Sequence, residues 1–459
     1  MCETQLATRS RVMDTPTDDR DVPNAHELAV GAPLALSDSA ENAVAWERVP
    51  YNAADYGPVN DFATDFDHAD KDYNANAPEI WKELRESGCP VAHSGRYGGM
   101  WAPITHEAVN DVAYDTENFT SRSVLVSHAR PGDAAVPAPI GVAPPVSSDP
   151  PFHNLARRLL LPPFAPKQIE PWEDEIRALC TRLLDEMGDI TPGDTVVDAA
   201  IQYAQHIPVS IIGRMLGFPE TDEDLFREFV HNTLETINAL TAERQANFKK
   251  LDAYLGAQVQ DHIDNPREDL TDYLLNVELG GEKLSQEHVR GSMVLLLIAG
   301  IDTTWSVIGS SLWHLAQTPA DLERLHDEPE VMTFALEEFL RAYAPVTMAR
   351  MVAKDIDFHG CPMKKDDWVL LPFPAANRDP RVFEDADQFI IDRESNRHAA
   401  FGLGIHRCLG SNLARLELKV ALEEFVKRFP KFELAGDVSW SVGQIRGPRV
   451  LPVRILETA

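Results

Sequence analysis

The sequence predicts a mainly α-helical protein with small β-sheets, that is, an α+β fold. Apolar residues recur at spacings of three and four over most of residues 153–343, which is the period of amphipathic helices. One such stretch, residues 285–317, would form a helix of about 50 Å, which is unusually long for a globular protein. Short runs that are typical of strands lie around these helices, near Val91, at 100–104 and over 350–372.

The elements follow in order along the chain. Residues 78–88 are expected to form a helix, because their apolar residues recur at helical spacing. The strands near residue 91 and at 100–104 come next, followed by a long loop over 121–148 that is rich in Pro and Ala. A loop of this length inside a compact chain is usually functional or mobile. The helices expected after it cover residues 153–161, 170–187, 203–216, 223–240 and 243–263.

The second half of the chain begins with the long helix. Ser285 is a suitable N-cap for it, and Pro319 would stop it. A further helix is expected over 330–343. The strands over 350–372 separate that helix from a final one at about 409–428.

Residues 1–48 are expected to be an acidic, disordered tail, and residues 49–459 a single globular domain. The tail is rich in Ala, Asp, Pro and Thr and has no apolar period. A docking segment for a partner is the alternative interpretation. The whole chain has 42 Lys and Arg against 73 Asp and Glu, a net charge of −31. Nucleic acids and anionic membranes bind basic surfaces, so neither is an expected partner.

The compartment is inferred from cysteine usage and from apolar runs. The chain has 5 cysteines, and no two of them have a C-x-x-C spacing, so neither a disulfide scaffold nor a structural zinc site is expected. The longest unbroken apolar run covers 293–299, whereas a membrane span needs about 20 apolar residues. The first ten residues contain no apolar signal region. We therefore expect a cytoplasmic protein with no membrane anchor.

One cysteine is placed for chemistry. Residues 401–410 read F-G-L-G-I-H-R-C-L-G, and Gly402 and Gly404 allow a tight loop there. Cys408 then falls at the start of the final helix. The N-terminal dipole of that helix, with two basic neighbours in the loop, would stabilise a thiolate. A single thiolate held in this way suits an axial ligand of haem iron.

An acid and an alcohol stand in the middle of the long helix. Residues 299–304 read A-G-I-D-T-T, and Gly and β-branched Thr are poor choices for a helix interior. Asp302 lies in an otherwise apolar stretch. A satisfied polar patch within a core helix is one interpretation, and a functional pair of Asp302 with Thr303 is the other.

Two further motifs combine residues on one helical face. Glu338 and Arg341 are three residues apart and can form an ion pair, although a surface pair is the usual cause of this pattern. Residues 149–158 read D-P-P-F-H-N-L-A-R-R, where a Pro suits the first helical turn. His153 and Arg157 are then four residues apart, so both would face the same anion.

Together these motifs resemble those of the cytochrome P-450 family. The cysteine segment matches the family pattern F-G-x-G-x-H-x-C-x-G at every fixed position. Glu338 and Arg341 match its E-x-x-R, and the segment at 149 resembles its D-P-P-x-H-x-x-x-R. The resemblance covers about residues 50–459 and implies the single-domain fold of that family, with the long central helix crossing the haem face. The chain looks like a member of the soluble bacterial branch.

The resemblance implies roles for individual residues. It implies haem b, that is iron protoporphyrin IX, with Cys408 as the metal ligand. Asp302 and Thr303 would be the catalytic pair that manages protons at dioxygen. The haem propionates would be bound by His153, Arg157, Arg350 and His406.

The same resemblance gives the E-x-x-R pair a structural role. Glu338 and Arg341 would brace the loop that carries the cysteine. In many members an Arg is the third partner of this pair, but Gln388 occupies its position here. Whether the nearby Arg393 takes its place is left open.

The implied activity is a monooxygenation, in which one oxygen atom of dioxygen is inserted into a lipophilic small molecule as a hydroxyl group. The apolar substrate pocket would be lined by Leu295, Ile298, Ala299, Val346, Met348 and Ile445. The chain has no flavin or nicotinamide fingerprint and no iron–sulfur cysteine set, so electrons would come from a ferredoxin and its NAD(P)H-dependent reductase. A basic docking patch would comprise Arg157, Arg158, Arg407, Arg415 and Lys419. A monomer is expected.

Two other functions fit the same cofactor. One is a peroxide-driven haem-thiolate peroxygenase, although such enzymes tend to lack the acid–alcohol pair. The other is a haem-dependent ligand sensor without turnover, although a sensor would not need a proton relay. Turnover with NAD(P)H and redox partners, compared with peroxide alone, separates the first alternative from a monooxygenase.

Overall fold

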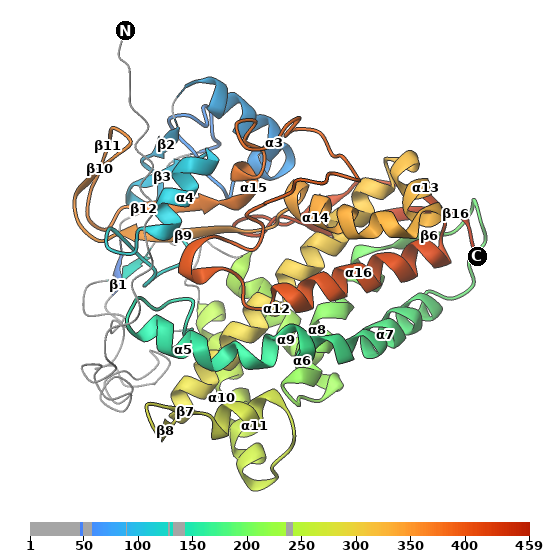
Figure 1. Ribbon diagram of the computed structural model, residues 1–459, viewed down its shortest axis with the longest axis horizontal. Coiled ribbons are helices and arrows are strands. Elements are labelled where there is room, and N and C mark those ends of the chain that lie inside the picture. The colour runs from blue at the N-terminus through green and yellow to red at the C-terminus, as the bar shows by residue number, and fades with distance from the viewer. Residues whose placement is uncertain (1–45, 49–56, 89, 127–128, 132–142, 236–241) are drawn as a thin grey trace.

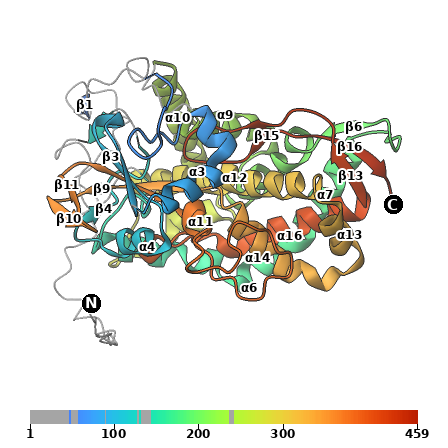
Figure 2. The same ribbon diagram turned by 90° about the horizontal axis from the view of Figure 1, so that it is seen from above.

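The computed structural model describes residues 46–48, 57–88, 90–126, 129–131, 143–235 and 242–459. About half of it is helical, and the largest sheet lies at one side (Figures 1 and 2). The predicted class, mainly α with small β-sheets, is confirmed. Of the predicted tail, residues 1–45 lie outside the described part, and Trp46–Arg48 form strand β1, which pairs antiparallel with β5 (Ala129–Pro131).

The long helix predicted over 285–317 is α12, Gln286–Leu315, and it runs through the middle of the molecule (Figures 1 and 2). Ser285 caps it as expected, because its side chain accepts a hydrogen bond from the backbone N–H of His288. Within the described residues α12 is the one helix long and apolar enough to cross a membrane. However, 67% of its most apolar window is buried inside the fold, as in the core helix of a globular protein.

Among the other helices, α8, α9, α10 and α16 pack against α12. Their bounds are α3 (Lys71–Glu86), α4 (His106–Tyr114), α5 (Phe152–Leu160), α6 (Pro166–Ile169), α7 (Glu173–Glu186), α8 (His206–Met215), α9 (Glu223–Leu234), α10 (Ala242–Asp264), α11 (Leu270–Asn276), α13 (Pro319–Asp327), α14 (Met332–Ala342), α15 (Phe373–Ala376) and α16 (Ser411–Arg428). The two helices that border the predicted motifs, α12 and α16, are therefore direct neighbours.

The main sheet has five strands in the order β2-β3-β12-β9-β4. Strand β12 (Trp368–Pro372) is central, parallel to β3 (Met100–Pro103) and antiparallel to β9 (Thr347–Val352). All five of its residues are buried, as in a strand covered on both faces. The other strands are β2 (Val91–Ser94), β4 (Phe119–Thr120), β6 (Val196–Asp198), β7 (Glu278–Leu279), β8 (Glu282–Lys283), β10 (Ile356–Phe358), β11 (Cys361–Met363), β13 (Lys431–Leu434), β14 (Ser439–Trp440), β15 (Pro448–Val450) and β16 (Pro452–Glu457).

Some elements differ from those that periodicity predicts. The helix predicted over 78–88 begins at Lys71 and bends at Asn76, because Pro78 has no N–H and disfavours helical geometry just before it. Helices α4, α11 and α13 and strands β13 to β16 were not predicted from the apolar spacing. Residues 236–240 of one predicted helix, and 127–128 and 132–142 of the predicted loop, lie outside the described part.

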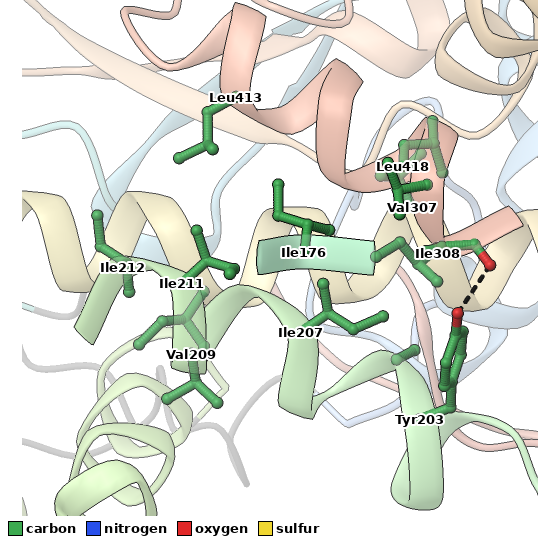
Figure 3. Close-up of a cluster of buried hydrophobic side chains, with 14 of the residues drawn as sticks. Ile176, Tyr203, Ile207, Val209, Ile211, Ile212, Val307, Ile308, Leu413 and Leu418 are labelled. Carbon is green, nitrogen blue, oxygen red and sulfur yellow. Dashed lines mark hydrogen bonds between the residues drawn. The ribbon is translucent and has the colours of Figure 1, made fainter. Parts of the chain in front are cut away.

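The largest core cluster joins α12 to α7, α8 and α16 (Figure 3). Ile176, Ile308 and Leu418 are fully buried in it. Tyr203 is also fully buried in it, and its hydroxyl donates a hydrogen bond to the carbonyl oxygen of Ala421 at 2.8 Å (Figure 3). Burying a side chain of the size of Leu or Ile stabilises the fold by about 1.5–3 kcal/mol. This packing fixes α12 relative to α16 and so positions the two motifs.

Candidate active site

One face of α12 keeps accessible surface in the middle of the molecule. Most neighbouring side chains on the helix are buried, but Leu295, Ile298, Ala299 and Thr303 are not. Their spacing of three, one and four residues places them on one helical face. The hydroxyl of Thr303 donates a hydrogen bond to the carbonyl oxygen of Ala299 at 2.8 Å. This face is therefore apolar except at Thr303, whose hydroxyl oxygen can still accept a hydrogen bond.

Asp302, next to Thr303, is only 1% exposed. Its Oδ1 accepts a hydrogen bond from Nη2 of Arg449 at 2.5 Å, and its Oδ2 is buried with no hydrogen-bond partner among the described residues. Burial raises the pKa of Asp302 to about 6, although the charge of Arg449 acts to lower it. The acid–alcohol motif thus contains an acid that can hold a proton near neutral pH. The sequence gives no sign of Arg449 as its partner.

The cysteine loop depends on a glycine that no other residue could replace without strain. Gly404 has a φ of 68°, and a Cβ there would be 2.2 Å from the carbonyl oxygen of Ala113 in α4. The backbone N–H of Cys408 donates to the carbonyl oxygen of Phe401 at 2.7 Å, which closes the loop. Helix α16 begins three residues later, at Ser411. Cys408 therefore precedes the helix closely, as predicted.

The thiol of Cys408 has accessible surface, yet it lies deep enough that burial raises its pKa. The backbone N–H of Gly410 and nearby guanidinium groups act in the opposite direction. In the polypeptide alone burial outweighs them, so the pKa of the thiol stays above its usual value. A metal cation changes this balance, because a coordinating thiol is deprotonated by the metal.

The predicted anion-binding residues gather beside this loop. The rings of His153 and His406 have centroids 4.4 Å apart, and Nε2 of His153 is buried without a hydrogen-bond partner among the described residues. Nε2 of His406 lies 2.8 Å from Oγ of Ser121. Nη2 of Arg157 donates to the carbonyl oxygen of Arg407 at 2.6 Å. The predicted pair His153 and Arg157 is therefore close to His406 in space.

Arg350 completes this group from strand β9. Its side chain is buried, and its Nη1 donates to the carbonyl oxygen of Ala349 at 2.7 Å. No carboxylate within ion-pair distance of Arg350 occurs in the described ranges, and burial lowers its pKa to about 10. Burial also lowers the pKa of His406, and the charges of Arg350 and its neighbours add to the effect. A buried cation without a carboxylate partner is a site for an external anion.

The E-x-x-R pair is buried and is not a surface ion pair. Nη2 of Arg341 lies 2.7 Å from Oε1 of Glu338, and both side chains are fully buried. Arg393 also binds this glutamate, with Nε 3.0 Å from Oε2, so it completes the network that sequence left open. Gln388 contributes its backbone carbonyl to it. Arg341 donates to the carbonyl oxygens of Asn377, Ala386 and Gln388.

The predicted pocket residues outside α12 lie on neighbouring segments. Val346 and Met348, at the start of β9, are half-buried. Val346 forms an antiparallel bridge with Ile445, which is itself buried in the main core cluster. Ile445 therefore offers the least surface of the six predicted pocket residues.

A buried acid on α16 does not follow from any motif. Glu417 is 2% exposed, and burial raises its pKa to about 8, although a hydrogen bond with Thr304 of α12 acts to lower it. It is therefore mostly neutral at pH 7. The only sequence signal would have been an acid on the apolar face of the predicted helix.

Two cations of the predicted docking patch are paired within the molecule. Nε of Arg415 lies 2.6 Å from Oε1 of Glu337. Nζ of Lys419 lies 3.2 Å from Glu173 and 3.8 Å from Glu423. The sequence places these basic residues on one helix, but it does not reveal the acids that neutralise them.

Comparisons with known proteins agree with the site. The family model Cytochrome P450 matches residues 194–439. The polyketide biosynthesis cytochrome P450 PksS of Bacillus subtilis is 33% identical over 319 residues, which are 68% of this chain and 77% of that protein. Its solved structure matches with a TM-score of 0.76 at 28% identity, over 85% of this chain and 100% of that one.

Two further relatives are informative. Mycinamicin IV hydroxylase/epoxidase of Micromonospora griseorubida is 32% identical over 317 residues, which are 67% of this chain and 79% of that protein. CYP109E1 of Bacillus megaterium, solved in complex with testosterone, matches with a TM-score of 0.75 at 27% identity, over 84% of this chain and 99% of that one. The chain therefore belongs to the cytochrome P450 family. It is a monooxygenase of the bacterial type, and its cofactor is haem with a cysteine thiolate ligand.

The residues of this chain fit that cofactor. Cys408 lies deep in the fold but keeps accessible surface, so its sulfur is suited to coordinate a metal ion. The orphaned Nε2 of His153 and the buried Arg350 supply donors for carboxylate groups such as the propionates. The apolar face of α12 suits the flat, apolar macrocycle.

Proposed function

We propose that this monooxygenase hydroxylates a lipophilic small molecule with electrons from a separate ferredoxin. The observation that carries the proposal is the accessible face of α12, where three apolar residues adjoin Thr303 and the buried acid Asp302. Apolar surface binds an apolar substrate, and the acid with the alcohol supplies protons.

Individual residues hold the cofactor in this proposal. Cys408 would hold the haem iron through its thiolate, and it is presented by a loop that Gly404 keeps tight against α4. His153, Arg157, Arg350 and His406 bind the propionates. Glu338 and Arg341, together with Arg393, brace the cysteine loop through their buried network. When bound, the haem supplies the activation of dioxygen by iron, which the thiolate makes more electron-rich.

Asp302 and Thr303 control protons. The hydroxyl hydrogen of Thr303 is directed to Ala299, so its oxygen accepts a hydrogen bond from a donor on the accessible face. Asp302 gains and loses a proton near pH 6, on a carboxyl shielded from bulk water. A general acid is most effective when its pKa lies near the working pH.

The substrate is proposed from the pocket and from the names of relatives. Leu295, Ile298, Ala299, Val346 and Met348 offer apolar surface, with Ile445 behind Val346. One relative is named for mycinamicin IV, and solved neighbours hold testosterone and pseudoionone. We infer a substrate that is likewise a lipophilic small molecule.

The remaining features complete the proposal. Residues 49–459 act as one domain, with residues 1–48 as an acidic tail. The protein works as a monomer in the cytoplasm, with dioxygen and a ferredoxin reduced by an NAD(P)H-dependent reductase as partners. A net charge of −31 is unfavourable for nucleic acid.

The experiment combines binding with turnover. Apolar compounds are screened against the ferric holoenzyme by haem difference spectroscopy, and hits are incubated with NADPH, ferredoxin and reductase. Hydroxylated product in that mixture is expected. Product with peroxide alone but not with the redox partners would indicate a peroxygenase, and binding without any product would indicate a ligand sensor.

A further inference from the structure

Arg449 lies between two carboxylates that come from different helices. Its Nη2 is 2.5 Å from Oδ1 of Asp302 on α12, and its Nε is 2.6 Å from Oε1 of Glu235 just after α9. Its Nη1 donates to Oγ of Ser306 at 3.0 Å, and its guanidinium lies 4.2 Å from the centroid of the Trp305 ring. All three nitrogen atoms are therefore engaged, and the guanidinium has one defined position.

Close packing of β15 on α12 puts Arg449 there. A Cβ at Gly447 would be 2.4 Å from Cβ of Ser306, and a Cβ at Gly309 would be 2.9 Å from Cγ of Pro448. Only glycine allows the strand and the helix to approach so closely. The side chain of Arg449 is mostly buried as a result, so its charge has to be balanced by nearby carboxylates.

The two carboxylates compete for this one cation. If both were ionised while His231 is neutral, the buried cluster would carry a net charge of −1, which burial disfavours. Glu235 has a second donor, because Nδ1 of His231 lies 3.4 Å from its Oε1. Burial alone would raise the pKa of Glu235, but hydrogen bonds from His231 and Arg449 outweigh burial and lower it. Glu235 is therefore the member of the pair that stays ionised.

Asp302 is the member of the pair that takes up a proton first as the pH falls toward about 6. Burial raises its pKa, the charge of Glu235 raises it further, and Arg449 and His231 lower it. In the described part of the chain these three residues, from β15, from α9 and from the residue after α9, are the charged groups that act on it. Since Oδ1 accepts the hydrogen bond of Arg449, the proton belongs on Oδ2, the buried oxygen that has no partner there.

We propose that Arg449 and Glu235 are positioning residues for proton transfer at Asp302. Arg449 fixes the carboxyl through Oδ1, and Glu235 shares the same guanidinium, so Asp302 remains able to carry a proton on Oδ2. When the carboxyl group swings toward the accessible face of α12, Oδ2 gives this proton to a water molecule there, the negative charge stays on the carboxylate beside Arg449, and a hydronium ion from solvent returns a proton to Oδ2 by the same route. The proposal rests on the proposed function, in which Asp302 supplies protons.

The test measures the protonation of Asp302 itself. In the ferric holoenzyme, the infrared C=O stretch of the protonated carboxyl, identified by its loss in Asp302→Asn, is titrated against pH. Glu235→Gln should lower the apparent pKa by about one pH unit, because Arg449 then has a single carboxylate. Arg449→Gln should raise it by a similar amount. Arg449→Lys keeps a cation and should return the value toward that of the wild type.

The pH profile of turnover on the same variants gives a second readout. The matched control is Glu433→Gln, which removes a carboxylate from an exposed pair with Arg454 and should leave both readouts unchanged. Opposite shifts in Glu235→Gln and Arg449→Gln support the proposal. Shifts in the same direction, or no shift, overturn it. A wild-type rate in Asp302→Asn would instead contradict the proposed function, because that variant removes the acid itself.

Discussion

At the scale of single residues, one thiol should decide the spectrum of the bound haem. Cys408 is a cysteine whose sulfur is accessible at a deep position, beside donors for carboxylates. Cys408→His should remove the thiolate-specific absorption band of the ferrous–CO form. Cys361→Ser, at a β-strand far from the loop in sequence, should retain it. If the band survives in Cys408→His, another residue is the ligand.

Thr303 should govern how efficiently electrons are used. Its hydroxyl oxygen accepts a hydrogen bond on the accessible face of α12, and alanine offers no such acceptor. Thr303→Ala should consume NAD(P)H but form less product and more peroxide. The neighbouring variant Asp302→Asn should instead slow turnover by roughly 10²-fold, because it removes the acid. The measurement is product formed per NAD(P)H oxidised, with haem content as the control. Unchanged coupling in Thr303→Ala would contradict the role of its hydroxyl.

At the scale of elements, the cysteine loop offers a matched pair of glycines. Gly404→Ala forces alanine into a left-handed conformation, which costs about 1–2 kcal/mol, and also drives its Cβ into the backbone of α4. Gly410→Ala meets nothing within 4 Å and has a φ of −82°, so it should cost about 1 kcal/mol or less as an N-cap change. We expect low haem content and a lower Tm in Gly404→Ala only. Equal behaviour of the two variants would show that the close approach to α4 is unimportant.

The packing of α16 on α12 should make stability depend on pH through Glu417. Its pKa is about 8 in the folded protein, against about 4.3 in the unfolded chain, so the folded state binds this proton more tightly. The resulting stabilisation is fully present below the unfolded pKa and is lost as the pH rises through about 8. Glu417→Gln cannot ionise, so its free energy of unfolding in urea should fall less than that of the wild type between about pH 6 and 9. Parallel pH profiles of the two proteins would contradict the buried, protonated acid.

At the scale of the whole molecule, the sequence predicted what depends on local spacing. The long helix with its Ser285 cap, the loop before Cys408 and the pairing of Glu338 with Arg341 all arise within a few residues of one another. The family resemblance extended the prediction of the site to residues that are far apart in sequence. It could not supply contacts that depend on how neighbouring elements pack.

The contact between Asp302 and Arg449 is the main case. It joins residues 147 positions apart and exists because glycines let β15 lie directly on α12. Likewise, Arg415 is basic in sequence, but Glu337 from α14 neutralises it in the fold. Partners of this kind follow from tertiary packing and leave no periodic signal in either segment.

The same neutralisation changes where an acidic electron donor should dock. Arg415 and Lys419 are paired with Glu173, Glu337 and Glu423. Arg177 shares two of these acids and also pairs with Glu424, so the cluster of three cations and four acids carries a net charge of −1. Arg158 and Arg407 are exposed, and in the described ranges no carboxylate lies within ion-pair distance of either. Steering depends on local charge, because charges farther than about 8–10 Å are screened by physiological salt. The exposed arginines are therefore the better candidates for contact with a ferredoxin.

Replacing both exposed arginines should weaken the encounter more than replacing the two paired cations. Arg158→Gln with Arg407→Gln removes groups free to contact the donor, and exposed charges of this kind change affinity by about two- to thirty-fold per pair. Arg415→Gln with Lys419→Gln removes cations that already form ion pairs within the molecule. This double variant should therefore affect the donor only through the long-range electrostatic attraction. The measurement is the rate of first electron transfer against ferredoxin concentration at low and high salt, with haem content and substrate affinity as controls. The difference between the variants should shrink as salt rises, because screening removes the steering term. A larger loss in the Arg415 and Lys419 variant at low salt would mean that the donor docks over the paired cations instead.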